Sequence, residues 1–136
     1  MRKLIDLTEN KYVVDSSAWI EYLRGSELGI KVKSIIEDRS NTCLTPNIVA
    51  AEVISKVIRA NEDEEKAIQA IKTFSSPLEG YQEIYFEAGK LHPELRKMFK
   101  NIGIADVIIK IFAEKNNARI ITKDLHLKSK NAIFLE

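Results

Sequence analysis

The chain has 136 residues, of which 45% are hydrophobic and 30% charged, and its formal net charge is +1. This length and composition are typical of a single soluble globular domain, which we expect to span residues 1–136. The longest apolar runs fall short of the roughly 20 residues that a membrane-spanning helix needs. Asp6 interrupts the N-terminal segment before the apolar stretch of a secretory signal develops. These features exclude an integral membrane protein and predict a cytoplasmic one, in which the single cysteine, Cys43, is a buried apolar residue.

Charge is unevenly distributed along the chain. Residues 1–89 contain 11 Lys and Arg against 15 Asp and Glu, a balance of −4, whereas residues 90–136 contain 10 against 5, a balance of +5. A basic C-terminal third would attract a polyanion. On charge alone, an unevenly charged solvated surface is the simpler interpretation.

The first half of the chain alternates short β-branched runs with segments of helical periodicity. In chain order we predict a strand at 12–14, a helix from Ser16 or Ser17 as its N-cap to Arg24, a helix over about 28–38, a strand at 42–45 and a helix over 47–60. Gly25 is expected to end the first of these helices.

The second half continues the alternation. We predict a helix over 64–74, a short strand within 78–83, a long helix over 84–100, an apolar helix over 105–114, and strands at 119–122 and 132–135. Pro93 is expected to kink or break the long helix. Strands that alternate with helices predict an α/β fold, in which a mostly parallel sheet is covered on both faces.

Four acidic residues stand out by their positions. Asp15 and Asp124 each follow a predicted strand, and in parallel sheets ligands bind beyond the carboxyl ends of the strands. Asp106 and Glu52 interrupt strongly apolar helical segments. A buried carboxylate without a partner costs several kcal/mol, so a cation is expected to compensate it.

Each acid also has an ordinary structural interpretation. Glu52 could pair with Lys56 and Asp106 with Lys110, each one helical turn away, for a few tenths of a kcal/mol. Asp106 could instead interact with a helix N-terminus. Asp15 could be a turn or cap residue and Asp124 a loop acid. Singly these interpretations are at least as good as a functional one, but jointly they require a fourfold coincidence.

Clustered carboxylates raise one another's pKa, and hard divalent cations relieve that repulsion. Ligation by oxygen alone suits Mg²⁺ or Mn²⁺, which also bind phosphate oxygens. Two histidines far apart and one cysteine offer no zinc-type spacing. Two such ions about 4 Å apart can hydrolyse a phosphodiester without a protein nucleophile.

Four blocks of the sequence together resemble the PIN domain, and specifically the VapC-type toxins of toxin–antitoxin pairs. The blocks are Val13 to Gly25, Thr45-Pro46 with Glu52, Ile104 to Ile108, and Ile121 to Asp124. The resemblance runs over nearly the whole chain.

The resemblance implies a three-layer α/β/α sandwich with an acidic pocket that binds Mg²⁺ or Mn²⁺. It implies an endoribonuclease acting on tRNA, rRNA or mRNA, a homodimer, and an antitoxin that blocks the pocket. The residues that match the family's acidic quartet are Asp15, Glu52, Asp106 and Asp124. Thr122 matches its supporting hydroxyl residue, and Ser16 occupies a position where the family often has a hydroxyl or Asn.

Two features depart from the family pattern. Some relatives carry a further acid shortly after the fourth block, where this chain has His126, and Pro93 interrupts a helix that is usually continuous. We interpret His126 as a surface residue, although it could donate to a phosphate. Trp19, Tyr22 and Leu23 are interpreted as core or dimer packing. Basic residues that could contact RNA backbone are Arg24, Arg96, Lys97, Lys100, Lys123 and Lys128.

Other functions fit less well. A phosphoryl-transfer receiver domain needs paired acids after its first strand, and a haloacid-dehalogenase phosphatase needs Asp-x-Asp, whereas here the strand leads into Asp15-Ser16-Ser17. With five glycines in the chain there is no glycine-rich phosphate loop. The remaining alternative is a PIN-like module that binds RNA or protein without cleaving it.

Overall fold

The computed structural model describes residues 10–136, in which five parallel strands form one central sheet. The strands are β1 (Lys11–Val14), β2 (Thr42–Pro46), β3 (Ser76–Leu78), β4 (Arg119–Thr122) and β5 (Ala132–Phe134), in the spatial order β3-β2-β1-β4-β5. Asp6, which argues against a secretory signal, lies outside this range. Because all four pairings are parallel, the carboxyl ends of all five strands meet at one edge.

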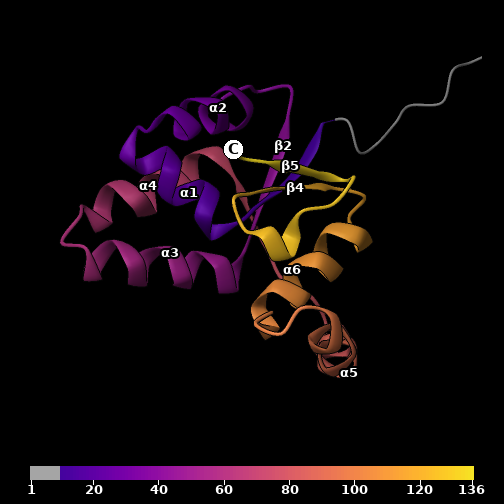
Figure 1. Cartoon of the computed structure of the whole chain (residues 1–136). Helices are drawn as coiled ribbons and strands as arrows, with labels where there is room; N and C mark the ends of the chain where they lie inside the picture. The colour runs from indigo at the N-terminus through magenta and orange to yellow at the C-terminus, as the bar shows by residue number, and fades with distance from the viewer. Residues whose placement is uncertain (1–9) are drawn as a thin grey trace, which may run out of the picture.

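Helices cover both faces of the sheet. They are α1 (Ser16–Arg24), α2 (Glu27–Ile36), α3 (Asn47–Arg59), α4 (Glu64–Phe74), α5 (Gln82–Met98) and α6 (Ile104–Lys115), with a short 3-10 helix η1 (Leu125–Leu127). Figure 1 shows α2 above the sheet and α6 with α5 below it. The predicted α/β/α sandwich is confirmed. Within residues 10–136, no helix has both the length and the apolar character required to span a bilayer.

The main core surrounds the sheet. Val13, Val14 and Ile121 are fully buried, as expected of parallel strands covered on both faces. Trp19 is also fully buried, and its indole Nε1 donates to Thr45 Oγ1 at 3.0 Å. Tyr22 and Leu23 pack against the same core, so these three residues are packing residues as predicted.

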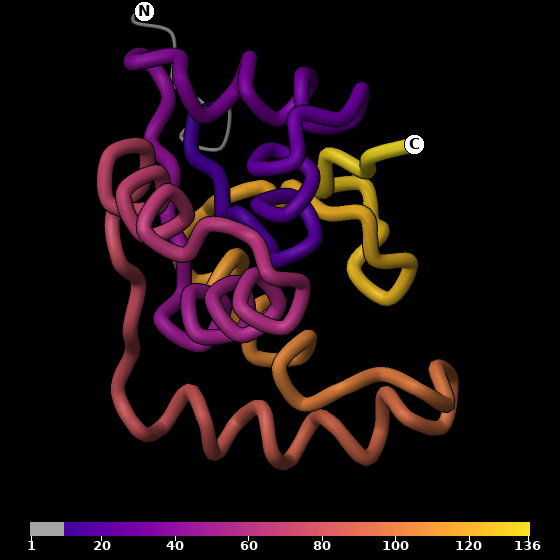
Figure 2. Tube along the Cα trace, turned by 90° about the vertical axis from the view of Figure 1, so that its left-hand side faces the viewer, coloured from indigo at the N-terminus to yellow at the C-terminus, as the bar shows by residue number. Residues whose placement is uncertain are grey.

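A second, smaller core joins α5 to α6. It contains Ala88 of α5 and Val107, Ile108, Ile111 and Phe112 of α6. Figure 2 shows α5 lying along the base of the molecule, with α6 between it and the sheet. α6, which carries Asp106, is therefore held between two cores.

Three local predictions differ from the structure. Neither Ser16 nor Ser17 is the N-cap of α1; Asp15 occupies that position, and its carboxylate makes no capping bond. β3 begins at Ser76 and includes Pro77, because an edge strand tolerates a residue without an N–H group. α5 continues through Pro93 without a break. Gly25 ends α1 as predicted, in a left-handed conformation with φ of 67°.

Cys43 is buried in β2, 5% exposed, as predicted. Burial raises the pKa of its thiol to about 11. A thiol in that state is a small apolar side chain, with no nucleophilic role.

Candidate metal centre

Asp15 directly follows the carboxyl end of β1, and its side chain is buried, with the residue 4% exposed. Its backbone N–H donates to Ile121 O on the neighbouring strand at 3.1 Å. Two hydroxyl groups donate to its Oδ2 atom, Ser17 Oγ and Thr122 Oγ1, each at 2.8 Å. The start of α1 and the end of β4 therefore orient this carboxylate together.

Asp124 follows β4 in a turn that the same hydroxyl groups hold. Its backbone N–H donates to Thr122 Oγ1 at 2.9 Å, and the N–H of Lys123 donates to Ser17 Oγ at 2.9 Å. The Oδ1 atom of Asp124 accepts from the backbone N–H of His126 at 2.9 Å. These bonds place the Asp124 side chain at the same edge of the sheet as Asp15.

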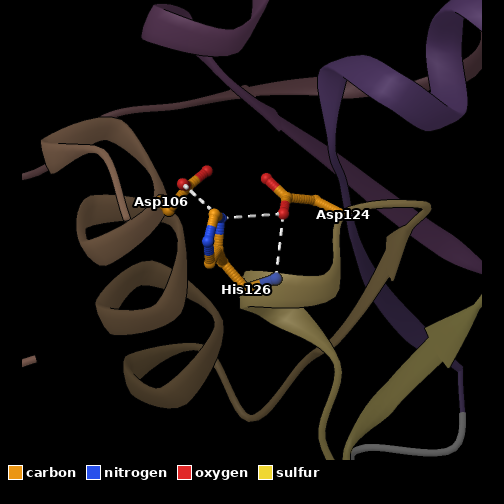
Figure 3. Close-up of side chains that lie close together, drawn as sticks. All are labelled: Asp106, Asp124 and His126. Atoms are coloured by element: carbon orange, nitrogen blue, oxygen red, sulfur yellow. Dashed lines mark hydrogen bonds and ion pairs between the residues drawn. The ribbon is translucent and has the colours of Figure 1, made fainter. Parts of the chain in front are cut away.

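Asp106 reaches this edge from the first turn of α6. Its Oδ2 atom accepts from the N–H of Gly103 at 3.2 Å, so it also interacts with a helix N-terminus, one of the alternatives above. Burial raises the pKa of Asp106, and the charges of Asp124 and Asp15 raise it further, against the lowering effect of the Gly103 bond. Figure 3 shows Asp106 and Asp124 on either side of the His126 ring.

Glu52 reaches the edge from α3. Its Oε1 atom is buried without a hydrogen-bond partner. Burial is the largest cause of its raised pKa, followed by the charge of Asp15; Lys56 lowers the pKa, and Asp106 and Asp124 raise it. The alternative of a Glu52–Lys56 ion pair is absent, and Lys56 Nζ instead lies 3.4 Å from Ser16 Oγ.

The structure thus brings the four predicted acids into one electrostatic environment, from four different elements. No ion pair links Asp106 to Lys110 among residues 10–136; the Lys110 ammonium lies 5.9 Å from the centre of the Phe99 ring. An orphaned buried carboxylate oxygen beside three further acids is the donor set that Mg²⁺ or Mn²⁺ prefers. The residues present therefore fit a divalent cation.

Two further residues take part in ways that the sequence analysis did not favour. His126 is not a surface residue remote from the site: its Nδ1 atom lies 3.2 Å from Asp124 Oδ1 and 3.8 Å from Asp106 Oδ2 (Figure 3). Ser17, not Ser16, supplies the hydroxyl that contacts Asp15. Sequence position favoured Ser16, and only the helix geometry places the second serine toward the carboxylate.

A hollow of about 430 Å³ is lined in part by Ser17, which contacts Asp15, and its four basic side chains outnumber the one acid, Glu21. Its basic lining residues are Arg24, Lys56, Arg59 and Lys123. Arg24 pairs with Glu62 at 3.1 Å and Lys123 with Glu21 at 3.4 Å. Lys56 and Arg59 also border a second hollow that includes Glu52, so positive charge lies directly beside the acidic centre.

A family model of the PIN domain matches residues 12–132. The chain belongs to the PIN-domain family. The match includes all four acids and the strands and helices that carry them. No curated protein sequence matches the chain.

Several solved structures share this PIN fold. A toxin–antitoxin complex from Klebsiella pneumoniae matches with a TM-score of 0.68 and 18% identity, over 92% of this chain and 98% of that one. VapBC2 from Rickettsia felis, bound to a DNA fragment from its promoter, matches with a TM-score of 0.67 and 19% identity, over 91% of this chain and 96% of that one. VapC20 from Mycobacterium tuberculosis, a toxin that cleaves the sarcin–ricin loop, matches with a TM-score of 0.65 and 15% identity, over 84% of this chain and 88% of that one. At these identities the likeness establishes the fold.

Proposed function

We propose that this PIN domain is a metal-dependent endoribonuclease and acts as the VapC-like toxin of a type II toxin–antitoxin pair. The observation that carries the proposal is the buried, unpartnered Oε1 atom of Glu52, whose pKa is raised by burial and by the charges of Asp15, Asp106 and Asp124. Such a cluster is poorly stable without a cation and well suited to one.

These four carboxylates would hold Mg²⁺ or Mn²⁺. When bound, the ion polarises a phosphate oxygen and lowers the pKa of a water. The protein's own part is to orient the ligands: Thr122 and Ser17 donate to Asp15, and the Gly103 N–H donates to Asp106. The charge of the four acids also disfavours a bare phosphate, so binding of the polyanion requires positive charge nearby.

The basic hollow beside the acids supplies that charge. Arg24, Lys56, Arg59 and Lys123 would contact backbone phosphates without reading bases. Of the other basic residues predicted to contact RNA, Lys97 pairs with Glu94, and Lys128 lies over the Phe134 ring. The hollow therefore supports a polynucleotide substrate, for which tRNA, rRNA and mRNA are the candidates.

A toxin role is supported by the fold neighbours, which include VapBC and other toxin–antitoxin structures. It implies a cognate antitoxin protein that covers the acidic centre, and a homodimer in the cytoplasm.

The decisive experiment is an RNA cleavage assay with Mn²⁺ or with EDTA, on the unaltered protein and on Asp15→Asn and Asp106→Asn. We expect cleavage that requires the metal and that each substitution reduces by more than the 10–100-fold typical of losing an outer-shell partner. Glu114→Gln, an exposed acid on α6, should cleave normally. Equal cleavage in EDTA excludes the mechanism. Metal binding without cleavage of any RNA favours the non-catalytic module.

The toxin role has a test of its own. Expression of the protein in growing cells should arrest growth unless the antitoxin is present.

A further inference from the structure

We infer that the Nδ1 atom of His126 is a direct ligand of the cation, so that the centre has a mixed nitrogen and oxygen donor set. The inference rests on the proposed function and adds a residue for which the acidic quartet does not account. It also changes the expected metal preference. An oxygen-only set favours Mg²⁺ and Mn²⁺, whereas an imidazole nitrogen suits later first-row ions.

The first argument is the position of the imidazole. His126, Asp106 and Asp124 each offer one donor atom, and these atoms all lie within 4.8 Å of one another. Nδ1 is 3.2 Å from Asp124 Oδ1 and 3.8 Å from Asp106 Oδ2, so it faces both carboxylates (Figure 3). Ligands about 2.1 Å from an octahedral ion are about 3 Å apart when adjacent and about 4 Å apart when opposite. The two separations measured from Nδ1, 3.2 and 3.8 Å, lie within this range, so one ion can contact the imidazole and a carboxylate together.

The second argument is that local structure holds the ring in this position. η1 begins directly after Asp124, and the backbone N–H of His126 donates to the Asp124 carboxylate. The edge of the ring packs against Phe99, with centroids 6.4 Å apart and planes at 74°. The side chain is 29% exposed. Both the backbone and an aromatic neighbour therefore restrict the imidazole to the side of the acids.

The third argument is that a single hydrogen bond does not account for a ring placed between two acids. One N–H group of the ring can reach Asp124 at 3.2 Å, but the 3.8 Å separation from Asp106 is beyond a hydrogen bond. A hydrogen bond from Nδ1 thus engages one of the two carboxylates, whereas a bound cation would contact both acids and the ring.

The experiment uses Mn²⁺ as the probe and pulsed electron paramagnetic resonance as the readout, on untagged full-length protein. The chain has two histidines, and the other one, His92, lies on α5 with its Nε2 atom 2.9 Å from Ile102 O. We expect the bound Mn²⁺ to show hyperfine coupling to an imidazole nitrogen. The coupling should disappear in His126→Asp, which supplies a carboxylate instead and still binds Mn²⁺, and persist in the control variant His92→Gln.

A second readout is metal preference in calorimetric titrations with Co²⁺ and Mg²⁺. The ratio of Co²⁺ affinity to Mg²⁺ affinity should fall by about tenfold or more in His126→Asp and stay unchanged in His92→Gln. Mn²⁺ bound without nitrogen coupling, or with coupling that survives His126→Asp, overturns the inference and leaves the nuclease proposal intact. Failure of the unaltered protein to bind Mn²⁺ overturns both.

Discussion

Two hydroxyl groups share the Oδ2 atom of Asp15, and one of them, on Thr122, is fully buried. Thr122 Oγ1 makes two hydrogen bonds: it donates to Asp15 Oδ2 and accepts from the backbone N–H of Asp124. A single side chain thus couples the orientation of two proposed ligands. Losing it should disturb both, although it touches no ion itself.

Thr122→Val tests this coupling because it keeps the shape and removes the hydroxyl. The N–H of Asp124 loses its acceptor, so we expect the free energy of unfolding to fall by about 1–3 kcal/mol. Mn²⁺ affinity should fall by roughly 10–100-fold, as for other outer-shell partners. Urea unfolding and calorimetry measure the two effects. Thr73→Val, at an exposed position on α4, is the control and should change neither. Unaltered Mn²⁺ affinity in Thr122→Val would count against the coupling.

Glu52 should make the metal-free protein less stable at neutral pH. Its pKa is raised in the folded state, so between the ordinary carboxyl pKa and the raised value the folded protein binds more protons than the unfolded chain. Stability therefore falls as pH rises through that window and stays lower above it. Below the ordinary pKa, the glutamic acid is neutral in both states and the cost is absent.

Glu52→Gln should consequently stabilise the metal-free protein at pH 7, by about 0.5–2 kcal/mol. Solvent screening reduces the gain because the side chain is half-buried. The gain should shrink as pH is lowered through the ordinary carboxyl range. Saturating Mn²⁺ should reverse the order, since the variant loses a ligand. Denaturant unfolding with and without Mn²⁺ measures this. If the variant is less stable than the parent protein in EDTA, the ionised Glu52 carboxylate does not destabilise the metal-free protein.

At the scale of elements, the approach of α2 to α1 depends on one glycine. A Cβ atom at Gly29 would overlap the carbonyl oxygen of Glu21 and lie 2.7 Å from its carbonyl carbon. Backbone cannot yield as a flexible side chain does, so α2 would have to shift away from α1. α1 in turn carries Ser17, which contacts Asp15.

Gly29→Ala should therefore lower the free energy of unfolding by about 1–3 kcal/mol, even though alanine is the better helix former. The matched variant is Gly89→Ala, within α5, where a Cβ atom meets nothing within 4 Å. There we expect a gain of about 0.5–1 kcal/mol from helix propensity alone. Thermal and urea unfolding of both variants measure the difference. Equal effects at the two positions would contradict the close approach of the two helices.

At the scale of the whole molecule, acidic and basic surfaces lie side by side. Lys56 and Arg59 are on α3, within two turns of Glu52, and line the hollows on both sides. Arg24 and Lys123 have carboxylate partners, whereas Lys56 contacts a serine hydroxyl and Arg59 a backbone carbonyl. The α3 cations are thus the better candidates for binding RNA phosphates.

The double variant Lys56→Ala, Arg59→Ala should weaken RNA binding and make it less dependent on salt. Binding is best measured by fluorescence anisotropy in an Asp15→Asn background, so that cleavage does not interfere. Each lost phosphate contact should reduce the slope of log affinity against log salt by about 0.7 for single-stranded RNA. The control is Lys31→Ala, Arg39→Ala, which removes the same charges from positions on and after α2, outside the hollow. An equal loss in both double variants would indicate general electrostatic attraction.

The sequence by itself determined most of the fold. Short apolar runs that alternate with amphipathic segments define parallel strands and their covering helices, because burial on both faces leaves a strand no polar side. The positions of Asp15 and Asp124 after strands, and of Glu52 and Asp106 in apolar helices, were also visible there. The periodic spacing of apolar residues is a local property of the sequence, so an acid that interrupts an apolar segment can be recognised without the tertiary structure.

Only the tertiary structure decided which side chains meet. The strand order brings the end of β4 beside the end of β1, and so places Thr122 against Asp15 across 107 positions of the chain. The roles of Ser17 and His126, and the positive hollow formed by α1, α3 and the β4 turn, depend on the same placement. The sequence places a side chain along its own helix or strand, but contacts between elements depend on how those elements pack.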